Sequence, residues 1–277
     1  MVRRERLDRE LVRRELARSR GHASELITAG RVLVGGIAAS KGTTMVERSA
    51  PIVVKEPADG EVDYVSRGGH KLAGAIEHFS KLGLDVARRH ALDAGASTGG
   101  FTDVLLRANV SHVVAADVGY GQLAWSLQQD ERVTVLDRTN IRSITSDDLP
   151  YAPDLVVSDL SFISLKTVLP ALAGCSADGA DLLLMVKPQF EVGKERLGSG
   201  GVVKSPQLRV EAVVSVAHSA QELGLSIRDV VASPLPGPSG NVEYFLWLRK
   251  YSEPGTGLSG EGLEAAVERA VKDGPTK

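Results

Sequence analysis

From residue 90 onward, short apolar runs alternate with stretches in which apolar residues recur at helical spacing. The runs predict a strand that ends at Asp93 and strands at 112–117, 133–136, 154–158 and 181–186, and the stretches predict helices at 100–108, 121–129, 164–173 and 206–223. This alternation is typical of a doubly wound α/β fold with a largely parallel sheet. Two final runs, 226–232 and 242–248, flank a turn rich in proline and glycine and predict an antiparallel hairpin at the sheet edge.

The first 55 residues carry a different pattern. Leu7, Leu11 and Val12 form an apolar helical stripe with arginines on the other face, and a second short helix is predicted at 23–29, closed by Gly30. Two short strands within 31–39, around a Gly-Gly turn, and a further strand at 50–55 complete the pattern. These elements predict a small, compact α+β module.

Breaks in the two patterns predict the domain boundaries. Residues 57–64 are acidic, contain Pro57 and Gly60, and have no apolar period, so we expect a linker there. The predicted organisation is a first domain at 1–56, the linker at 57–64, a second domain at 65–250 that opens with a helix at 72–79, and a polar C-terminal tail at 251–277 with one short helix at about 260–271.

Charge is unevenly distributed along the 277 residues. The whole chain has a formal net charge of -2, but residues 1–56 hold 12 Lys and Arg against 7 Asp and Glu, a formal +5, which leaves -7 on the remainder. A basic module on an acidic body suggests that the module binds a polyanion such as RNA. The alternative is a solvated helix face whose charges pair with one another.

Other features of the sequence bear on metal binding, cellular location and membrane insertion. The single cysteine, Cys175, cannot form an internal disulfide or a cysteine metal cluster, so no metal is expected and a reducing cytoplasm is the expected location. Charged residues begin within the first few positions of the chain, and the apolar segment of a secretory signal is not seen there. No apolar run approaches the roughly 20 residues that cross a bilayer, so membrane insertion is not expected.

The loop after the strand that ends at Asp93 is rich in small residues and leads into a predicted helix. In a doubly wound sheet, ligands bind at the carboxyl ends of the strands, against this turn. The loop lacks the Gly-x-Gly-x-x-Gly of a dinucleotide site, and an acid ahead of the glycines suits a cationic ligand without phosphate, such as S-adenosylmethionine. An NAD or nucleotide site remains the alternative. The expected cofactor contacts are Asp93, Gly95, Ser97, Gly99, Gly100 and Phe101.

The next two predicted strands also end near polar side chains. Asp117 lies 24 residues after Asp93, which is the spacing of a ribose-binding acid. Asp137, or Asn140, follows the third strand and is a candidate to bind the adenine amine. Acids are common on protein surfaces, but acids after three consecutive strands together favour S-adenosylmethionine.

The sequence lacks the residues that two kinds of base methylation require. Methylation at a pyrimidine C5 uses a cysteine nucleophile, and Cys175 lies on a predicted apolar helix, where a core position is expected. Methylation of an exocyclic amine usually places Asn/Asp-Pro-Pro-Tyr/Phe after the fourth strand. The sequence there reads Ser158-Asp-Leu-Ser-Phe162. Neither chemistry is supported.

Two lysines and two acids are candidate catalytic residues, although they are far apart in sequence and can converge only in three dimensions. Lys187 and Asp159 are predicted at the same edge of the sheet. Lys187 and Asp159 each follow a strand, Glu243 begins the closing strand, and Lys71 lies in the first turn of the helix before the sheet. A ribose 2′-hydroxyl is a poor nucleophile, and a neutral lysine amine could accept its proton during methyl transfer. Lys187 is therefore a candidate base, although each acid could instead be an ordinary salt-bridge partner.

The first 55 residues resemble the S4 RNA-binding domain. The resemblance rests on Arg6-Leu-Asp8, Leu11-Val12, Ala17-Arg-Ser-Arg20, Leu26-Ile27 and Ala29-Gly-Arg-Val32. In that family the helix pair and the adjoining loop present basic side chains to structured RNA. The resemblance implies phosphate contacts by Arg6, Arg18, Arg20 and Arg31. Arg67, ahead of the first helix of the second domain, is a further candidate RNA contact.

Longer motifs over about residues 3–250 resemble the TlyA (haemolysin A) family, whose members join an S4 domain to an FtsJ-like methyltransferase domain. They begin at Ser66, Leu92, Ala116, Ser158, Val186 and Gly240. The resemblance implies a Rossmann-like class I methyltransferase sheet, mostly parallel with an antiparallel final strand. It also implies transfer of a methyl group from S-adenosylmethionine to ribose 2′-hydroxyls of ribosomal RNA, at cytidines of 16S and 23S rRNA. The implied catalytic tetrad is Lys71, Asp159, Lys187 and Glu243.

Three functions remain open from the sequence. The first is this rRNA methyltransferase, acting on ribosomal RNA or ribosomal subunits as a monomer or weak dimer. The second is a membrane-active haemolysin, for which the sequence has no spanning segment and no long, cleanly amphipathic helix. The third is an RNA-binding assembly factor with an inert methyltransferase fold, against which the complete tetrad and glycine turn argue.

Overall fold

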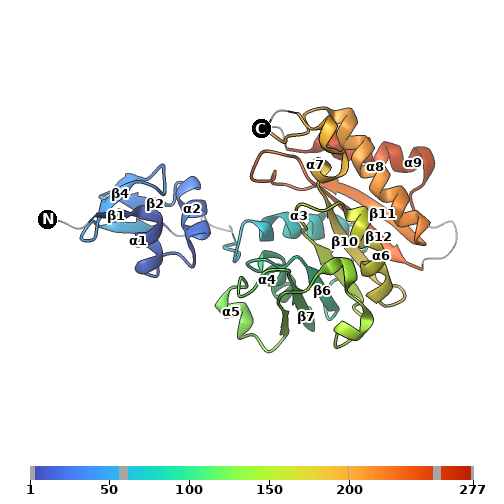
Figure 1. Cartoon of the computed structure of the whole chain (residues 1–277), viewed down its shortest axis with the longest axis horizontal. Helices are drawn as coiled ribbons and strands as arrows, with labels where there is room; N and C mark the ends of the chain where they lie inside the picture. Colours follow the sequence, from blue (N-terminus) through green and yellow to red (C-terminus); the bar gives the residue numbers. More distant parts are fainter. Residues whose placement is uncertain (1–3, 56–61, 199, 252–256, 276–277) are drawn as a thin grey trace. The chain divides into compact units, whose positions relative to one another are not determined.

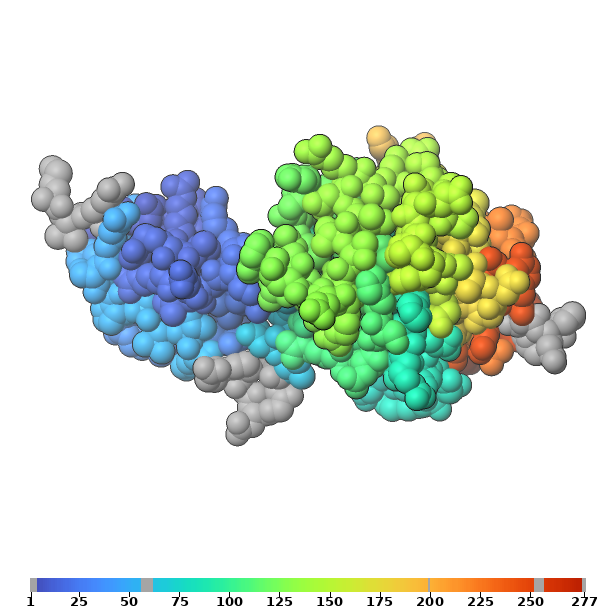
Figure 2. Space-filling view, turned by 90° about the horizontal axis from the view of Figure 1, so that it is seen from below, coloured from blue at the N-terminus to red at the C-terminus, as the bar shows by residue number. Residues whose placement is uncertain are grey.

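The computed structural model describes residues 4–55, 62–198, 200–251 and 257–275. The chain forms two compact units, Met1–Arg67 and Gly68–Lys277 (Figure 1 and Figure 2). Residues 57–61 of the predicted linker lie outside the described residues, and residues 62–64 have no regular secondary structure.

The first unit contains short helices and strands in the order β1 (Arg4–Arg6), α1 (Leu7–Arg13), α2 (Arg20–Thr28), β2 (Val32–Val34), β3 (Ile37–Ala38), β4 (Met45–Glu47) and β5 (Ile52–Val54). β2 pairs with β3 and β5, and β1 pairs with β4, always antiparallel. The predicted stripe of Leu7 and Leu11 is buried in a core that also contains Leu26, Ile27 and Val32. The predicted α+β module is therefore confirmed.

Two strands of the first unit were missed by the sequence prediction. β1 (Arg-Glu-Arg) contains no apolar residue, and β4 (Met-Val-Glu) contains two, so neither forms an apolar run that predicts a strand. The second helix also begins earlier than predicted, at Arg20, because the Ser19 hydroxyl accepts the backbone N–H of His22 and caps the helix there.

The second unit is an α/β fold with helices α3 (Gly68–Ser80), α4 (Gly100–Arg107), α5 (Trp125–Gln128), α6 (Leu165–Cys175), α7 (Pro188–Glu191), α8 (Pro206–Glu222) and α9 (Gly260–Asp273). Its strands are β6 (His90–Ala94), β7 (His112–Ala116), β8 (Val133–Leu136), β9 (Leu155–Ser158), β10 (Asp181–Val186), β11 (Leu225–Ala232) and β12 (Tyr244–Lys250). Three 3₁₀ turns, η1 (Ile141–Ser143), η2 (Ser146–Asp148) and η3 (Lys194–Arg196), lie in the connections.

The seven strands form one sheet in the order β11-β12-β10-β9-β6-β7-β8. β12 runs antiparallel to both of its neighbours, while β10, β9, β6, β7 and β8 are mutually parallel. The predicted mostly parallel sheet with an antiparallel final strand is confirmed. Because β6 is followed in sequence by β7 on one side and neighboured by β9 on the other, the strand order reverses between β6 and β9. Ligands bind at such a switch point.

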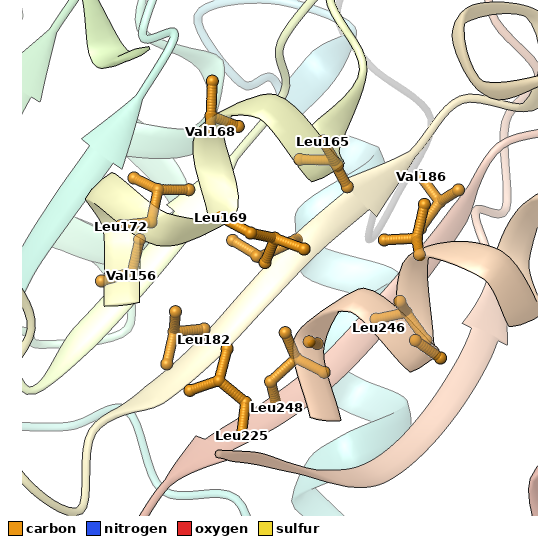
Figure 3. Packing of buried hydrophobic residues seen from close by; sticks show 14 of the residues in the cluster. Val156, Leu165, Val168, Leu169, Leu172, Leu182, Val186, Leu225, Leu246 and Leu248 are labelled. Carbon is orange, nitrogen blue, oxygen red and sulfur yellow. The ribbon is translucent and has the colours of Figure 1, made fainter. Parts of the chain in front are cut away.

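Alternation along β12 explains how helices cover both faces of the sheet. Leu246 and Leu248 lie in the main core, together with Leu165 and Leu169 of α6 (Figure 3). Buried residues of α8 and α9 belong to the same core. The intervening Phe245 and Trp247 point to the other face, where their rings contact Phe101 of α4 and Phe79 of α3. Since successive side chains of a strand point to opposite faces, one apolar strand supplies both cores.

The predicted helix at 121–129 is wrong for its first half, since α5 spans only Trp125–Gln128. The backbone ahead of α5 is held by other partners. The N–H groups of Gly119 and Gly121 donate to the carboxylates of Asp117 and Asp137. Side-chain acceptors of this kind compete with helix formation, which the apolar spacing alone does not reveal.

Helix α9 lies in the segment that the sequence predicted as a polar tail. It packs against α8 and β11, and Leu263 and Val267 are completely buried in the main core. The polar residues between them, which suggested a tail, occupy the solvent face of an amphipathic helix.

The stability of the second unit should therefore depend on α9. We expect Leu263→Ala to lower the free energy of unfolding by about 2–5 kcal/mol, because it removes a buried side chain and leaves a cavity. Glu264→Ala, an exposed neighbour on the same helix, is the control and should change it by less than about 0.5 kcal/mol. Urea denaturation measures both. Equal stabilities of the two variants would show that α9 is not part of the cooperative core.

Candidate active site

The turn after β6 contains the glycines that the sequence predicted as cofactor contacts. Gly99 has a φ of 98°, and a Cβ atom there would clash with Leu127 Cδ1. Gly95 has a φ of 91°, and its Cβ would lie 2.9 Å from Leu160 Cδ2. Both positions therefore require glycine for the turn and for close packing against it. Ser97, between them, is exposed to solvent.

The two residues that open α4 are buried rather than exposed. Gly100 and Phe101 are packed beneath the turn, and the Phe101 ring contacts Phe245 of β12 at a centroid distance of 5.9 Å. Their predicted cofactor contact stays a prediction, and their observed role is to seat the helix on the sheet.

Asp93 lies near the end of β6 and is completely buried. Its Oδ2 accepts a hydrogen bond from the Thr102 hydroxyl at 2.7 Å, while Oδ1 has no hydrogen-bond partner among the described residues. Burial raises the pKa of Asp93 from 3.8 to about 7; the Thr102 hydroxyl opposes this, and the charges of Asp159 and Asp117 add to it. Oδ1 is thus the atom that can still accept a hydrogen bond or carry a proton.

Asp117 and Asp137 support the loops after β7 and β8. Asp117 accepts the N–H of Ser97 at 2.8 Å and that of Gly119 at 2.7 Å, and Asp137 accepts the N–H of Gly121 at 2.9 Å. Asn140 caps η1 by accepting the N–H of Arg142. A carboxylate oxygen has a second lone pair, so these bonds leave capacity for a ligand.

The predicted tetrad is brought together by the register of the sheet. Val186, the last residue of β10, is paired with Tyr244, the first residue of β12. Lys187 and Glu243 therefore leave adjacent strands at the same edge. Asp159 follows β9, the other neighbour of β10, and Lys71 lies in the first turn of α3.

The four side chains form a continuous series of opposite charges. Lys187 Nζ lies 2.6 Å from Asp159 Oδ1, Lys71 Nζ lies 4.0 Å from Asp159 Oδ2, and Lys71 Nζ donates to Glu243 Oε2 at 2.5 Å. The exposed fractions of the side chains are 9% for Lys187, 7% for Lys71 and 1% for Glu243, against 23% for Asp159. Ion pairs this buried are held in place, since separating them would leave a charge without a partner.

Three residues near this series were missed by the sequence analysis. Ser161 Oγ accepts a hydrogen bond from Lys187 Nζ at 2.8 Å. Phe162 is 91% exposed and has a φ of 63°, a strained conformation for an aromatic residue. Gly237 leaves the space that Glu243 occupies, because a Cβ there would clash with Glu243 Oε1. The Ser-Phe pair directly after Asp159 was visible in the sequence, whereas the Gly237 contact was not.

Cys175 lies in the core, as expected. It is almost completely buried on α6, donates to the carbonyl of Leu172, and burial raises the pKa of its thiol to about 11. A thiol that stays protonated in an apolar setting is a poor nucleophile.

The predicted RNA-binding arginines of the first unit are organised by protein acceptors. Arg6 and Arg20 both bind the carboxylate of Asp8, and their hydrogen bonds, led by that of Arg6, lower the pKa of Asp8 to about 2. Arg18 donates to the carbonyl of Tyr64, and Arg31 donates to the carbonyl of Lys55. Arg67 also has an interaction within the protein.

Models of two protein families match the chain. The FtsJ-like methyltransferase model matches residues 64–250, and the S4 domain model matches residues 5–51. The 16S/23S rRNA (cytidine-2′-O)-methyltransferase TlyA of Mycobacterium tuberculosis is 58% identical over 275 residues, 99% of this chain and 100% of the relative. The chain belongs to the TlyA family of FtsJ-like methyltransferases.

Two further proteins match over nearly the same length. The Bacillus subtilis protein YqxC is 38% identical and aligns with 97% of this chain and 93% of its own. The solved structure of a Streptococcus thermophilus protein, named with the word hemolysin, is 34% identical, covers 98% of this chain and 97% of its own, and has a TM-score of 0.76. Despite that word, no helix among the described residues of this chain is long and apolar enough to cross a membrane.

Asp93 should make the stability of the apoprotein fall with rising pH. Its pKa is about 7 when folded and 3.8 when unfolded, so the folded state holds an extra proton between these values, and stability decreases as pH rises through that range. At 1.36 kcal/mol per pKa unit the full loss is about 4 kcal/mol above pH 7. Asp93→Asn resembles the protonated form and should escape this loss.

The measurement is the free energy of unfolding of the wild type and Asp93→Asn at pH 5 and pH 8, without added cofactor. The variant should gain stability relative to the wild type at pH 8, while the two should differ less at pH 5. A difference that does not change with pH would contradict the raised pKa. Comparing the two proteins cancels every other titrating group that they share.

Proposed function

We propose that the protein transfers a methyl group from S-adenosylmethionine to ribose 2′-hydroxyls of ribosomal RNA, at cytidines of the 16S and 23S molecules, in the cytoplasm. The observation that carries the proposal is the buried series Lys187–Asp159–Lys71–Glu243 at the carboxyl edge of a methyltransferase sheet. The rRNA (cytidine-2′-O)-methyltransferase activity of the relative at 58% identity indicates the substrate class. Mapping 2′-O-methyl groups on ribosomal RNA from cells with and without this gene tests it directly.

The glycine turn fits S-adenosylmethionine as the cofactor. Asp93 Oδ1 is buried without a described partner, and its complete burial favours a water-mediated contact with the amine of the ligand. Asp117 would bind the ribose, and Val118 beside it is 75% exposed and offers an apolar surface to the adenine. Asp137 and Asn140 would bind the adenine amine. Bound there, the cofactor supplies an electrophilic methyl group on a positively charged sulfur.

Lys187 is the proposed general base. A neutral amine at Nζ accepts the proton of the 2′-hydroxyl, which makes the oxygen nucleophilic as the methyl group is transferred. Asp159 Oδ1 and Ser161 Oγ hold the amine from two sides, at 2.6 and 2.8 Å, and fix its direction. Burial of Lys187 keeps competing water away from the nitrogen.

Lys71 and Glu243 are proposed to keep Asp159 in place during the proton transfer. When Lys187 is neutral, Asp159 loses one ionic partner but keeps Lys71 at 4.0 Å. Glu243 in turn anchors Lys71 at 2.5 Å, so the lysine cannot move away. The Lys71–Glu243 pair thus keeps a cation near Asp159 when Lys187 is neutral. This lowers the free-energy cost of leaving the Asp159 carboxylate without its partner in a site with little solvent.

The exposed aromatic side chain at Phe162 supports a nucleic-acid substrate. Phe162 lies three residues after Asp159, is 91% exposed and has a strained backbone. Aromatic faces stack on unpaired bases, each worth about 1–3 kcal/mol. Phe162 is therefore proposed to stack on the base of the nucleotide whose ribose reaches Lys187.

Lys187→Ala should reduce methyl transfer by at least roughly 10²-fold, because it removes the proton acceptor. Cofactor affinity should stay within about twofold, since Lys187 is not among the proposed cofactor contacts. The assay is transfer of labelled methyl groups to ribosomal RNA, to isolated subunits and to assembled ribosomes. Lys81→Ala, which removes an exposed lysine paired with Glu77, is the control and should retain activity. Wild-type rates in Lys187→Ala would refute the assignment of the base.

RNA binding by the first unit should depend on Arg20 more than on Arg13. Both side chains are about half exposed, at 54% and 46%, and each binds a carboxylate, but only Arg20 is proposed to contact phosphate. Arg20→Ala should weaken RNA binding and lower the slope of log K against log salt concentration by about 1. Arg13→Ala should leave the slope unchanged. Equal effects of the two variants in a binding titration would remove the proposed role of Arg20.

A further inference from the structure

Glu191 is a carboxylate outside the tetrad whose hydrogen bonds the proposed mechanism does not use. It is the last residue of α7, the short helix that begins directly after Lys187. Its Oε2 accepts the Ser164 hydroxyl at 2.6 Å, and its Oε1 accepts the backbone N–H of Leu165 at 2.8 Å. Both donors lie at the start of α6, where unpaired N–H groups and the helix dipole favour a negative charge.

These bonds join the two segments that carry the proposed base and its carboxylate partner. One segment is α7 with Lys187 ahead of it, and the other is the loop at 159–164 between β9 and α6. At one end, Lys187 contacts Asp159 and Ser161. At the other end, Glu191 holds the start of α6. The loop is thus attached to the α7 segment at both of its ends.

The middle of the loop is strained and is also held by α7. Phe162 has a φ of 63°, and its ring lies 5.4 Å from that of Phe190, the residue before Glu191. A non-glycine residue keeps such a conformation only where its surroundings enforce it. The bonds that Glu191 accepts hold one side of Phe162, and the hydrogen bond from Lys187 to Ser161 holds the other.

The carboxylate of Glu191 is held in one position by its surroundings rather than being free in solvent. Burial raises its pKa, while the bonds from Ser164 and Leu165 and the charge of Lys166 lower it. A partly buried carboxylate that already accepts two short hydrogen bonds has little reason to move, and both bonds would be lost if the loop shifted.

We infer that Glu191 is a positioning residue of the methyl-transfer reaction, which clasps the 159–164 loop to α7 and so sets the geometry between Asp159, Ser161 and Lys187. The inference rests on the proposed function. Glu191 itself contacts neither the tetrad nor a reacting atom, so it acts through the loop. A displacement of about 1 Å at reacting groups can cost about 10²-fold in rate.

The test compares Glu191→Ala and Glu191→Gln in single-turnover methyl transfer at saturating RNA and cofactor. At saturating RNA, Glu191→Ala should lower the rate roughly 10- to 100-fold, while the dissociation constant of the cofactor stays within about twofold. Glu191→Gln should stay within about threefold of the wild type, because its amide can accept the Leu165 N–H and donate to the Ser164 oxygen. Because Glu191→Gln keeps the hydrogen bonds but removes the negative charge, its activity shows whether the bonds or the charge of Glu191 are needed.

The control is Asp148→Ala at η2. Asp148 has a matching role, since its carboxylate accepts both the N–H of Thr145 at 2.8 Å and its hydroxyl at 2.9 Å. Both Glu191→Ala and Asp148→Ala should lower the melting temperature by roughly 2–4 °C, as expected for a lost helix cap in a domain of this size. Only Glu191→Ala should lower the rate of methyl transfer.

If Glu191→Ala does not fold, Ser164→Ala removes one of the two bonds and should lower the rate roughly 3- to 10-fold. The inference is overturned if the variant that folds transfers methyl groups within twofold of the wild type, or if its activity falls only in proportion to the folded fraction. A wild-type protein that methylates no ribosomal RNA would instead overturn the proposed function. The wild-type rate therefore distinguishes the two failures.

Discussion

The burial of two lysine side chains is the constraint on which the active edge of the sheet depends. Lys71 and Lys187 expose less than a tenth of their side chains, and removing an ammonium group from water costs several kcal/mol unless a carboxylate lies beside it. Each lysine has such a partner, Glu243 and Asp159. Because the partners come from four separate segments, the ion pairs can form only when the sheet and the helix before it are in register.

The antiparallel strand β12 satisfies this constraint. A parallel strand beside β10 would begin at the opposite edge of the sheet, and its first residue could not reach Lys71. Because β12 runs the other way, its start lies beside the end of β10, and Glu243 enters the edge where Lys187 emerges. The turn before it contributes Gly237, whose missing Cβ leaves room for the carboxylate. The antiparallel direction of β12 is therefore what places Glu243, the residue just before the strand, at this edge.

Sequence reasoning found the layers of the second unit and placed Lys187 and Asp159 at one edge, because strand ends in a parallel sheet converge there. The family resemblance, rather than the strand pattern, joined Lys71 and Glu243 to them. Sequence reasoning could not find the order of contacts within the charge series, since which lysine meets which carboxylate depends on distances across four segments. It failed at α5, where the acceptors Asp117 and Asp137 lie outside the apolar pattern. It also predicted a helix at about 260–271 but assigned it to a polar tail, whereas α9 packs into the main core. The sequence of a mostly polar helix does not show which surface its apolar face will contact.

The acids after the strands have a structural use that a motif does not reveal. Asp117 binds two backbone N–H groups and Asp137 binds one, so both hold the loops around the proposed cofactor site before any ligand arrives. Asp93 differs, since it is buried and keeps one oxygen without a described partner. A carboxylate that already holds the loop can also accept hydrogen bonds from the ligand with its remaining lone pairs. Binding then does not have to order this side chain, so it loses no conformational entropy there. The same side chains can therefore shape the pocket and recognise its ligand, and an acid at a strand end is evidence for either role until its hydrogen bonds are known.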